Sequence, residues 1–599
     1  MPSLLVTLPN NLIYNIYMAR VRFLKLVTLA AFLVVAARLF SIQIIEHNKW
    51  VEAAEAQHTL LEKIVAKRGE IYMMDQNEPV PVVLNQTAYS VIIDPAVTNK
   101  DKIKEALEKY AEGKTTVNID ELYEIEGLRY YVVARNISRD AASKIADEGI
   151  SGVWLQNSNV RVYPEGELAS GLLGFVNADG VGQYGVEGSL NTQLKGKDGM
   201  LKTISDINNI ALSIGDDNIK IPAENGKNIV LTVDRGIQRG VEDILAKAVN
   251  ETPATNFSAI VMEPTTGKVL AMANYPNYNP GDYGNVKDAS AYINYVTEVP
   301  YEPASTCKPF AFSAAINEGR MTGDTTYWNE GYTVVDGWKI NNAEQRSSIY
   351  GEITMKTALY WSLNTGSINA LKLLGDDPSR ITQSGREKLY DYYHNKFRLG
   401  QATGIELIEA EGTIADPNEG YGRDSVYANM TFGQNMYVTM IQVATAFSAI
   451  VNGGYYIEPT IVAGEYKDGM LIPAERKINS TQILSEETSV MMRDMLQNNR
   501  NYKVRGGIDR EGYAIGGKSG TAQVVRDGSY DNTMSETIAS YIGYGGTAGE
   551  LPKYVIMVKM WGEGEYMDSG VLSNVAFDPI SNYLINYLKI QPKVEENAD

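Results

Sequence analysis

A serine and a lysine three positions apart, Ser305 and Lys308, have the spacing of a nucleophile and its base. Residues at i and i+3 lie on one face of a helix, and Pro303 just upstream fits a helix start. A helix amino terminus carries positive potential, which together with desolvation favours a neutral lysine. Neutral Lys308 could then take the proton of Ser305 and make it a nucleophile. Alone, this pair occurs by chance in many long chains.

A second triplet, Ser362-Leu363-Asn364, lies within a run, 355–373, whose pattern predicts a helix. Ser362 could relay protons between Lys308 and a leaving amine. Asn364 offers both a donor and an acceptor to a substrate amide. The triplet by itself is weak evidence, and it gains weight only beside the other motifs.

The third motif reads GKSGT and contains Lys518, Ser519, Gly520 and Thr521 in a predicted strand. The lysine supplies a fixed positive charge, and the two hydroxyls could grip a substrate carboxylate. The glycines let a substrate backbone approach closely. The backbone N–H groups of Thr521 and Ser305 could form an oxyanion hole. The three motifs, in this order, are far more specific than any one of them.

The elements that must position these motifs are strands at both ends of the second half of the chain. Helical patterns dominate between them, from Ser305 to about Gly453. This order indicates one antiparallel sheet assembled from both ends and covered by helices, an α+β fold. The predicted strands are 229–234, 258–262, 268–273, 511–525, 538–544 and 554–559, and the helices beside them are 238–249 and 579–589.

The charge of the chain is unevenly distributed. The formal net charge is −19, yet residues 1–45 contain basic side chains and no acidic ones. An acidic surface repels phosphate backbones, which argues against nucleic acid as a partner. A basic, apolar head on an acidic body is typical of a protein anchored in a membrane.

The apolar segment Leu24–Ile45 is long enough to cross a bilayer as a helix. Lys25 and Arg38 lie toward its ends and could reach the headgroups. Two arginines precede it, so the positive-inside rule places the amino terminus in the cytoplasm and the rest outside. A secretory signal cleaved near 35–37 and a buried core helix are the alternatives. The apolar pattern continues past the small residues, which favours the anchor.

No set of residues points to a metal or a cofactor. Cys307 is the only cysteine, so no disulfide can form within the chain. The three histidines, His47, His58 and His394, form no metal-binding motif. We therefore expect neither metal nor cofactor, and we interpret Cys307 as a small packed residue.

The stretch 46–225 alternates strand-like and helical runs, and no residue set in it suggests chemistry. A polar segment with Pro and Gly, 216–228, is predicted to be a linker. The predicted organisation is a cytoplasmic tail 1–23, a transmembrane anchor 24–45, an elongated mixed pedestal domain 46–225, a catalytic domain 226–590 and an acidic tail 591–599.

Together, these motifs resemble those of the class B penicillin-binding proteins, the monofunctional peptidoglycan transpeptidases, over roughly 38–585. Ala304 stands where this family usually has glycine, and Ser519 where threonine is commoner. The residues MMDQN at 73–77 replace its usual Asp-Arg-Asn-Gly. Further similar stretches are RLF at 38–40, KRGEIY at 67–72, RVYP at 161–164, GQYGVEG at 182–188, EPAS at 302–305 and FGQN at 432–435.

The resemblance implies a fold like the serine β-lactamases and an acyl-enzyme on Ser305. This serine would attack the D-Ala-D-Ala amide of a peptidoglycan stem peptide and pass the acyl group to a neighbouring stem. β-Lactams would acylate the same serine. The implied partners are the lipid-linked precursor, a membrane glycosyltransferase and other division proteins. The pedestal lacks the glutamate-bearing motifs of a glycosyltransferase, so we expect a monofunctional enzyme.

Four other interpretations stay open at this point. The compact pedestal and the position of Ser305 favour septal wall synthesis over an elongation-type role. A D,D-carboxypeptidase or β-lactamase would hydrolyse the acyl-enzyme instead of transferring it. A β-lactam sensor needs more membrane helices than the one apolar span visible in the sequence. A catalytically silent scaffold is disfavoured because all three motifs are intact.

Overall fold

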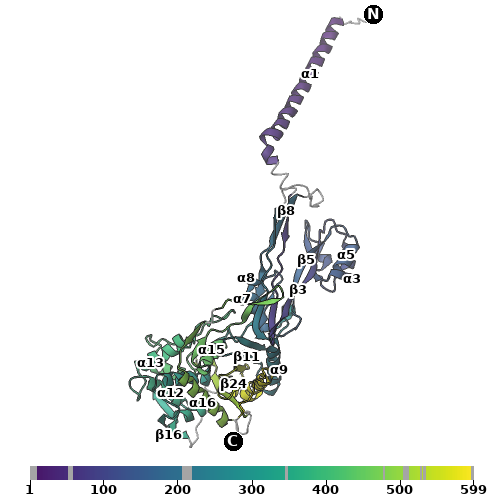
Figure 1. Cartoon of the computed structure of the whole chain (residues 1–599). Coiled ribbons are helices and arrows are strands. Elements are labelled where there is room, and N and C mark those ends of the chain that lie inside the picture. Colours follow the sequence, from purple (N-terminus) through teal and green to yellow (C-terminus); the bar gives the residue numbers. More distant parts are fainter. Residues whose placement is uncertain are drawn as a thin grey trace. The chain divides into compact units, whose positions relative to one another are not determined.

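The computed structural model describes residues 10–50, 59–204, 219–343, 349–476, 479–503, 511–526, 529–530 and 535–594 (Figure 1). The chain divides into two compact units, each built from two segments. The first unit is Met1–Ala66 with Lys197–Asn225, and the second is Lys67–Gly196 with Gly226–Asp599. The predicted pedestal range is thus shared between them. Parts of the predicted tails, pedestal and linker (1–9, 51–58 with His58, 205–218 and 595–599) lie outside the described residues.

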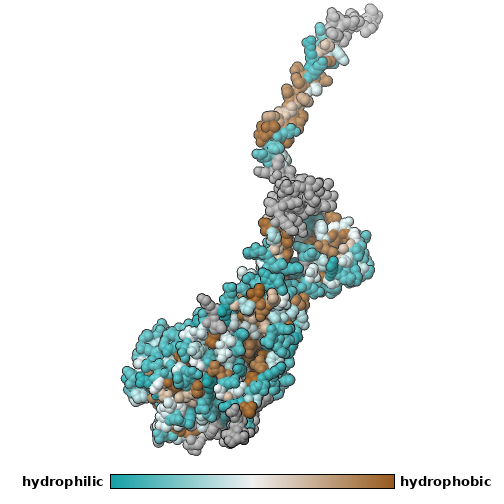
Figure 2. Space-filling model, viewed as in Figure 1, coloured by the Kyte–Doolittle hydropathy of each residue, from teal (hydrophilic) through white to brown (hydrophobic). Residues whose placement is uncertain are grey.

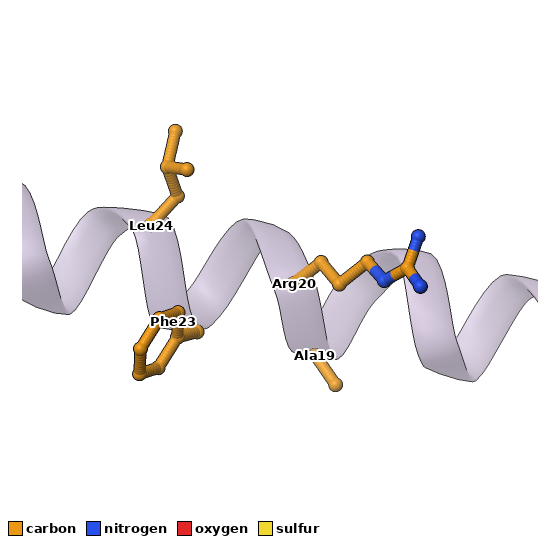
Figure 3. A pocket seen from close by; sticks show the side chains of 4 residues that line it. All are labelled: Ala19, Arg20, Phe23 and Leu24. Atoms are coloured by element: carbon orange, nitrogen blue, oxygen red, sulfur yellow. The ribbon is translucent and has the colours of Figure 1, made fainter.

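The first unit contains the apolar amino-terminal helix. Helix α1 (Asn10–Phe40) continues into a π-helical turn, η1 (Ser41–Ile45). Tyr17–Ile45 is long and apolar enough to cross a membrane, and none of it is buried. Figure 2 shows apolar surface along this helix. Figure 3 shows a shallow hollow on α1 lined only by side chains of the helix itself, Ala19, Arg20, Phe23 and Leu24. A single apolar amino-terminal helix is therefore confirmed in the part of the chain that is described.

The first unit also has a small antiparallel sheet in the order β1-β8-β9. Its strands are β1 (Thr59–Ile64), β8 (Gly199–Ile204) and β9 (Ile219–Ile221). Thr59 pairs with Ile204 and Ile64 with Gly199. Segments that lie far apart in the sequence thus pair with each other in this sheet.

A seven-stranded sheet of the second unit joins the pedestal stretch to the catalytic stretch. Its order is β19-β18-β10-β2-β3-β4, and β5 also pairs with β3. Strand β10 runs parallel to β2, with Ile229 opposite Ile71. The two stretches therefore share backbone hydrogen bonds and belong to one compact unit. The strands are β2 (Ile71–Asp75), β3 (Glu78–Ile93), β4 (Tyr131–Ile137), β5 (Val153–Val162), β10 (Ile229–Asp234), β18 (Val462–Lys467) and β19 (Met470–Pro473).

Three helices near this sheet bury a core of their own with β3, β4 and β5. They are α3 (Lys100–Tyr110), α4 (Ile119–Leu122) and α5 (Arg139–Asp147). Asn99 and Ser138 cap α3 and α5 by accepting from a backbone N–H of the first turn. The remaining elements before residue 197 are short: α6 (Ser170–Leu173), β6 (Phe175–Val176), β7 (Gly182–Gln183), α7 (Gly185–Ser189) and α8 (Asn191–Lys195).

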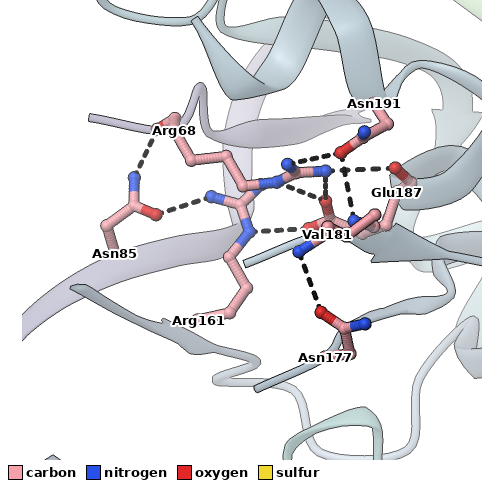
Figure 4. Close-up of polar contacts among 8 residues, drawn as sticks. Arg68, Asn85, Arg161, Asn177, Val181, Glu187 and Asn191 are labelled. Carbon is pink, nitrogen blue, oxygen red and sulfur yellow. Dashed lines mark hydrogen bonds and ion pairs between the residues drawn. The ribbon is translucent and has the colours of Figure 1, made fainter. Parts of the chain in front are cut away.

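A buried ionic network ties three of the family-like stretches together (Figure 4). The carboxylate of Glu187, with no exposed side-chain surface, accepts from Arg68 Nε at 2.7 Å and from Arg161 Nε at 2.6 Å. Arg68 also donates to Asn191 Oδ1 at 2.8 Å, and Arg161 to Asn85 Oδ1 at 2.8 Å. One carboxylate therefore binds two arginines, Arg161 from β5 and Arg68 from the segment before β2.

The catalytic stretch is built on a five-stranded antiparallel sheet in the order β12-β11-β25-β24-β21. Two strands come from its beginning and three from its end, which confirms a sheet assembled from both ends. The predicted strand 229–234 is an exception, because it forms β10 of the seven-stranded sheet, where it pairs with β2. The strands are β11 (Asn256–Met262), β12 (Val269–Tyr275), β21 (Tyr513–Gln523), β24 (Thr537–Thr547) and β25 (Tyr554–Trp561).

Both faces of this sheet are covered, because alternate residues of each strand enter different cores. Ala259 and Val558 pack with helices α9 (Arg235–Glu251) and α18 (Asp578–Tyr587). Ile260 and Met557 pack with the helices inserted between the two halves of the sheet. Those inserted helices are α10 (Lys308–Asn317), α11 (Met355–Tyr360), α12 (Asn364–Leu374), α13 (Gln383–Tyr390), α14 (Asp424–Met430), α15 (Met440–Val451) and α16 (Glu486–Lys503).

Short hairpins and turns complete the catalytic stretch. Near α12, the strands β14 (Tyr332–Val335) and β15 (Trp338–Asn341) form a hairpin, and β13 (Thr326–Asn329) pairs with β16 (Gly351–Thr354). Further pairs are β17 (Tyr455–Ile457) with β20 (Ser480–Gln482), and β22 (Val525–Arg526) with β23 (Ser529–Tyr530). The short helical segments are η2 (Pro280–Asn285), η3 (Ala289–Tyr292), η4 (Ala304–Cys307), η6 (Asp391–Lys396), α17 (Ser569–Leu572) and η7 (Ser573–Phe577).

Buried polar contacts within the second unit fasten α9 to the stretch that precedes it. The carboxylate of Glu242 on α9 accepts from the Ala169 N–H at 2.8 Å, from Gln238 Nε2 at 2.7 Å and from Asn277 Nδ2 at 3.2 Å. Burial raises the pKa of Glu242 to about 7. These contacts hold the start of the catalytic stretch against α6.

Candidate active site

The candidate nucleophile, Ser305, lies on the 3-10 turn η4, and Lys308 begins the α-helix α10. The prediction of one continuous helix through both residues is therefore wrong in detail. Ala304 has a left-handed backbone with φ of 50°, which prevents a regular α-helix from starting at Pro303. The Ala304 N–H donates to the Gly433 carbonyl at 3.1 Å, so the turn is fixed from outside.

The Lys308 amine joins the first motif to the second. It donates to Asn364 Oδ1 at 2.9 Å, to Ser362 Oγ at 3.2 Å and to the Ser362 carbonyl. The Lys308 side chain is almost fully buried, with 1% of its surface exposed. Its stem is thus surrounded by protein while its nitrogen faces the polar atoms of the second motif.

The second motif lies in a break between two helices and not inside one. Helix α11 ends at Tyr360, and α12 begins at Asn364. Ser362 between them has a left-handed backbone with φ of 55°. This conformation turns the Ser362 carbonyl and hydroxyl toward Lys308, which a continuous helix could not do. The predicted helical run 355–373 is therefore interrupted at the residue that the chemistry uses.

A hairpin outside the three motifs orients Asn364. Its side-chain nitrogen donates to the Asn341 carbonyl of β15 at 3.0 Å, while its oxygen accepts from Lys308. The amide is therefore held at both ends. Sequence reasoning missed Asn341, because a backbone carbonyl leaves no trace in residue types.

The third motif lies on β21, at an edge of the five-stranded sheet. Lys518 is fully buried. A methyl group at Gly520 would lie 2.8 Å from the Pro303 carbonyl oxygen and 3.0 Å from the Thr306 nitrogen, so only glycine lets the strand approach the serine turn. Asn499 Nδ2 donates to the Gly517 carbonyl at 2.6 Å and anchors the strand from α16. The structure thus places the third motif against the turn that carries the first.

Strand alternation separates the side chains of the third motif. Lys518 and Gly520 lie on the face of β21 that meets the serine turn, and Ser519 and Thr521 lie on the other. Both hydroxyl residues are half-buried, and Thr521 Oγ1 lies 2.9 Å from Ser569 Oγ. Their grip on a substrate carboxylate stays a prediction, as does the oxyanion hole.

A carboxylate just before the serine turn ties that turn to the loop after α14. Glu302 is 5% exposed, and it accepts from the Asn435 N–H at 2.7 Å. Asn435 has a left-handed backbone with φ of 59°. The family-like stretches EPAS and FGQN are therefore in direct contact. Their resemblance identified them in the sequence, but the pattern did not reveal that they touch.

Cys307 is fully buried, and its Sγ lies 3.7 Å from Met436 Sδ. Burial raises the pKa of the thiol well above its usual range, so the thiol stays protonated. It therefore packs beneath the site and does not act as a nucleophile. Among the residues that the structure describes, no group of three His, Cys, Asp or Glu side chains could hold a metal ion.

Both halves of the chain match families of known proteins. Residues 257–582 match the penicillin binding protein transpeptidase domain, and residues 63–231 match the penicillin-binding protein dimerisation domain. Stage V sporulation protein D of Bacillus subtilis is 31% identical over 538 residues, covering 88% of this chain and 79% of that protein. The peptidoglycan D,D-transpeptidase FtsI of Escherichia coli is 28% identical over 478 residues, covering 79% of this chain and 74% of that protein.

Solved structures have the same fold. Penicillin binding protein 2X from Streptococcus thermophilus superposes with a TM-score of 0.68 at 24% identity, covering 88% of this chain and 80% of that one. The fold and the three joined motifs define a serine acyl-transferring domain of the penicillin-binding type. The chain belongs to the class B penicillin-binding proteins, with a dimerisation domain followed by a transpeptidase domain, which confirms the resemblance seen in the sequence.

Proposed function

We propose that this chain cross-links peptidoglycan stem peptides through an acyl-enzyme on Ser305. The observation that carries the proposal is the position of the Lys308 amine, within hydrogen-bond distance of both Ser362 and Asn364. In the proposed reaction these three side chains act on Ser305 and its substrate as base, proton relay and amide-binding group. The relatives named peptidoglycan D,D-transpeptidase support the same reaction.

In the first half of the reaction, Lys308 in its neutral form takes the proton of Ser305 as Oγ attacks the D-Ala-D-Ala carbonyl. The N–H groups of Ser305 and Thr521 stabilise the oxyanion that forms. The C–N bond then breaks, and the departing D-alanine amine receives the proton through Ser362. The product is an ester of the shortened stem peptide with Ser305.

The second half transfers this ester to an amine of a neighbouring stem. The amine attacks the ester carbonyl, loses its proton through Ser362 and Lys308, and releases the serine hydroxyl. Lys518, Ser519, Gly520 and Thr521 hold the donor peptide through its carboxylate and backbone. β-Lactams enter the first half only, because their opened ring stays on the serine.

For the cellular role, we propose septal wall synthesis with the catalytic unit outside the cytoplasmic membrane. The basic residues before the apolar helix support an amino terminus in the cytoplasm. The FtsI and PbpB relatives support the division-type role. A membrane glycosyltransferase and other division proteins are the proposed partners. Septal rather than side-wall localisation of a tagged copy is the expected outcome.

The test of the nucleophile is labelling of the full chain in detergent with a fluorescent penicillin, followed by mass spectrometry of the adduct. Wild type and Cys307→Ala are expected to carry one adduct on Ser305, and Ser305→Ala none. Equal labelling of Ser305→Ala would overturn the assignment. Rapid release of hydrolysed penicillin would instead indicate a β-lactamase, and release of D-alanine from a stem peptide with no cross-linked product would indicate a carboxypeptidase.

A further inference from the structure

A second buried lysine, Lys559, lies in the sheet behind the serine turn. It is on β25 with 2% of its surface exposed. Its ammonium lies 4.5 Å from the ring centre of Tyr301, 5.0 Å from that of Trp561 and 5.9 Å from that of Tyr295. The rings of Tyr295 and Trp561 are themselves 4.7 Å apart. Lys559 therefore ends in a cage of three aromatic rings.

The position of this cage connects it with the active site. In the sheet register, Lys559 pairs with Ser540, and Ser540 pairs with Gly520 of the third motif. These residues form one row across three strands, and side chains in a row point to the same face. Gly520 in that row touches the serine turn. Lys559 is thus on the face of the sheet that supports Ser305.

Tyr301 is the physical link between the cage and the nucleophile. It lies four residues before Ser305, and its backbone forms hydrogen bonds of 3.0 Å in both directions with Val438. The left-handed residue Ala304 lies between the two. A non-glycine residue in that conformation is strained and must be held by its surroundings. A cation over the Tyr301 ring fixes the segment that leads into this strained turn.

The energetics indicate that this lysine is not there for stability. No carboxylate among the described residues pairs with it, and burial alone lowers the pKa of Lys559 to about 7. Burying a cation without an anion is unfavourable, and an apolar side chain of similar shape would pack there more favourably. Cation–π contacts offset part of this penalty in the charged form. A residue that weakens the fold yet faces the active-site turn is a candidate for function.

We propose that Lys559 is a positioning residue for the acylation of Ser305, acting through Tyr301. The caged ammonium fixes the Tyr301 ring, and the Tyr301 backbone then fixes the approach to Ala304 and Ser305. The role rests on the proposed function of Ser305. It adds to that function a buried residue of the sheet that acts through Tyr301.

The titratable groups that face Lys559 are Tyr301, from the segment before the serine turn, and Tyr295, from the loop after η3. Ser540 and Ser258 face it from the two flanking strands. Burial raises the pKa of Tyr301 well above its usual range, so that ring stays neutral. Lys559 is therefore the group of this cluster whose charge changes near neutral pH.

The test compares second-order acylation by a fluorescent penicillin at pH 6 and pH 8.5, using the full chain in detergent. Lys559→Met is expected to keep or raise the thermal unfolding midpoint. It is expected to acylate about tenfold more slowly than wild type at pH 6, the size of a desolvated cation–π contact. The difference should shrink at pH 8.5, where the wild-type lysine is also neutral.

Lys372→Met is the matched control, because Lys372 on α12 is also a partly buried lysine whose pKa is lowered by burial. It is expected to acylate at the wild-type rate at both pH values. Should Lys559→Met fail to fold, Lys559→Arg keeps a cation in the cage, and it is expected to retain fast acylation at pH 8.5. Wild-type rates at both pH values in Lys559→Met, or slow acylation at pH 8.5 in a folded Lys559→Arg, would overturn the inference. A wild type that is never labelled would overturn the proposed function, and this role with it.

Discussion

The buried network around Glu187 allows a stability prediction from its contacts. Glu187→Gln keeps the shape of the side chain but removes the charge that two buried arginines share. The side chains of Arg68 and Arg161 are 9% and 5% exposed, so water cannot replace the lost charge. Removing one partner of a buried ion pair destabilises a fold by about 3–5 kcal/mol. We expect a loss of that size in the free energy of unfolding of the second unit.

Urea unfolding followed by tryptophan fluorescence measures this loss. With a slope of about 3 kcal/mol per molar urea, the midpoint of the affected transition should fall by roughly 1–1.7 M. Asp140→Asn is the control, because it breaks an exposed pair with Lys144 and should leave the midpoint unchanged. If Glu187→Gln unfolds at the wild-type midpoint, the charge of Glu187 does not hold the two arginines, and the reasoning is refuted.

Two further predictions concern the catalytic stretch and use the same unfolding measurement. Ala304→Gly is expected to raise the free energy of unfolding by up to about 1 kcal/mol. Glycine relieves the left-handed strain at φ of 50°, and the conformational entropy that glycine loses on folding is a smaller penalty than that strain. A lower unfolding midpoint would contradict this account of the turn. Burial raises the pKa of Glu242 from 4.5 to about 7, so the folded state favours the protonated carboxyl. The free energy of unfolding of the wild type should therefore fall by roughly 3 kcal/mol as the pH rises from about 4.5 to about 7. Glu242→Gln should lack this decrease, and an unchanged pH dependence would show that another group causes it.

The sequence was sufficient to predict the five strands of the catalytic sheet, because these strands are apolar runs whose order along the chain restricts the topology. It also predicted Ser305, Lys308 and Ser362 as catalytic residues, and the structure brings the Lys308 amine to Ser362. It could not show the break at Ser362, since a left-handed backbone at a serine has no local sequence pattern. The parallel pairing of β10 with β2 was equally hidden, because it joins strands more than 150 residues apart by backbone groups alone.

Lys559 shows a different limit of sequence reasoning. In the run YVIMVKMW, one lysine among apolar residues predicts a strand and says nothing about where the ammonium lies. Two of the three rings of its cage, Tyr295 and Tyr301, come from a segment more than 250 residues earlier in the chain. Such a contact depends on tertiary structure, and only the folded chain reveals it.

The backbone conformations around Ser305 explain why distant residues should affect its reactivity. Ala304, Ser362 and Asn435 are all non-glycine residues with positive φ. Ala304 directly precedes Ser305, Ser362 accepts from Lys308, and Asn435 donates to the carboxylate just before the serine turn. Each such conformation is unfavourable by about 1–3 kcal/mol and persists only when its surroundings hold it. The nucleophile is therefore placed by the packing around three strained residues and not by one helix. Weakening that packing should slow acylation before it unfolds the protein, which is why the acylation rate and the unfolding midpoint must be measured on the same variants.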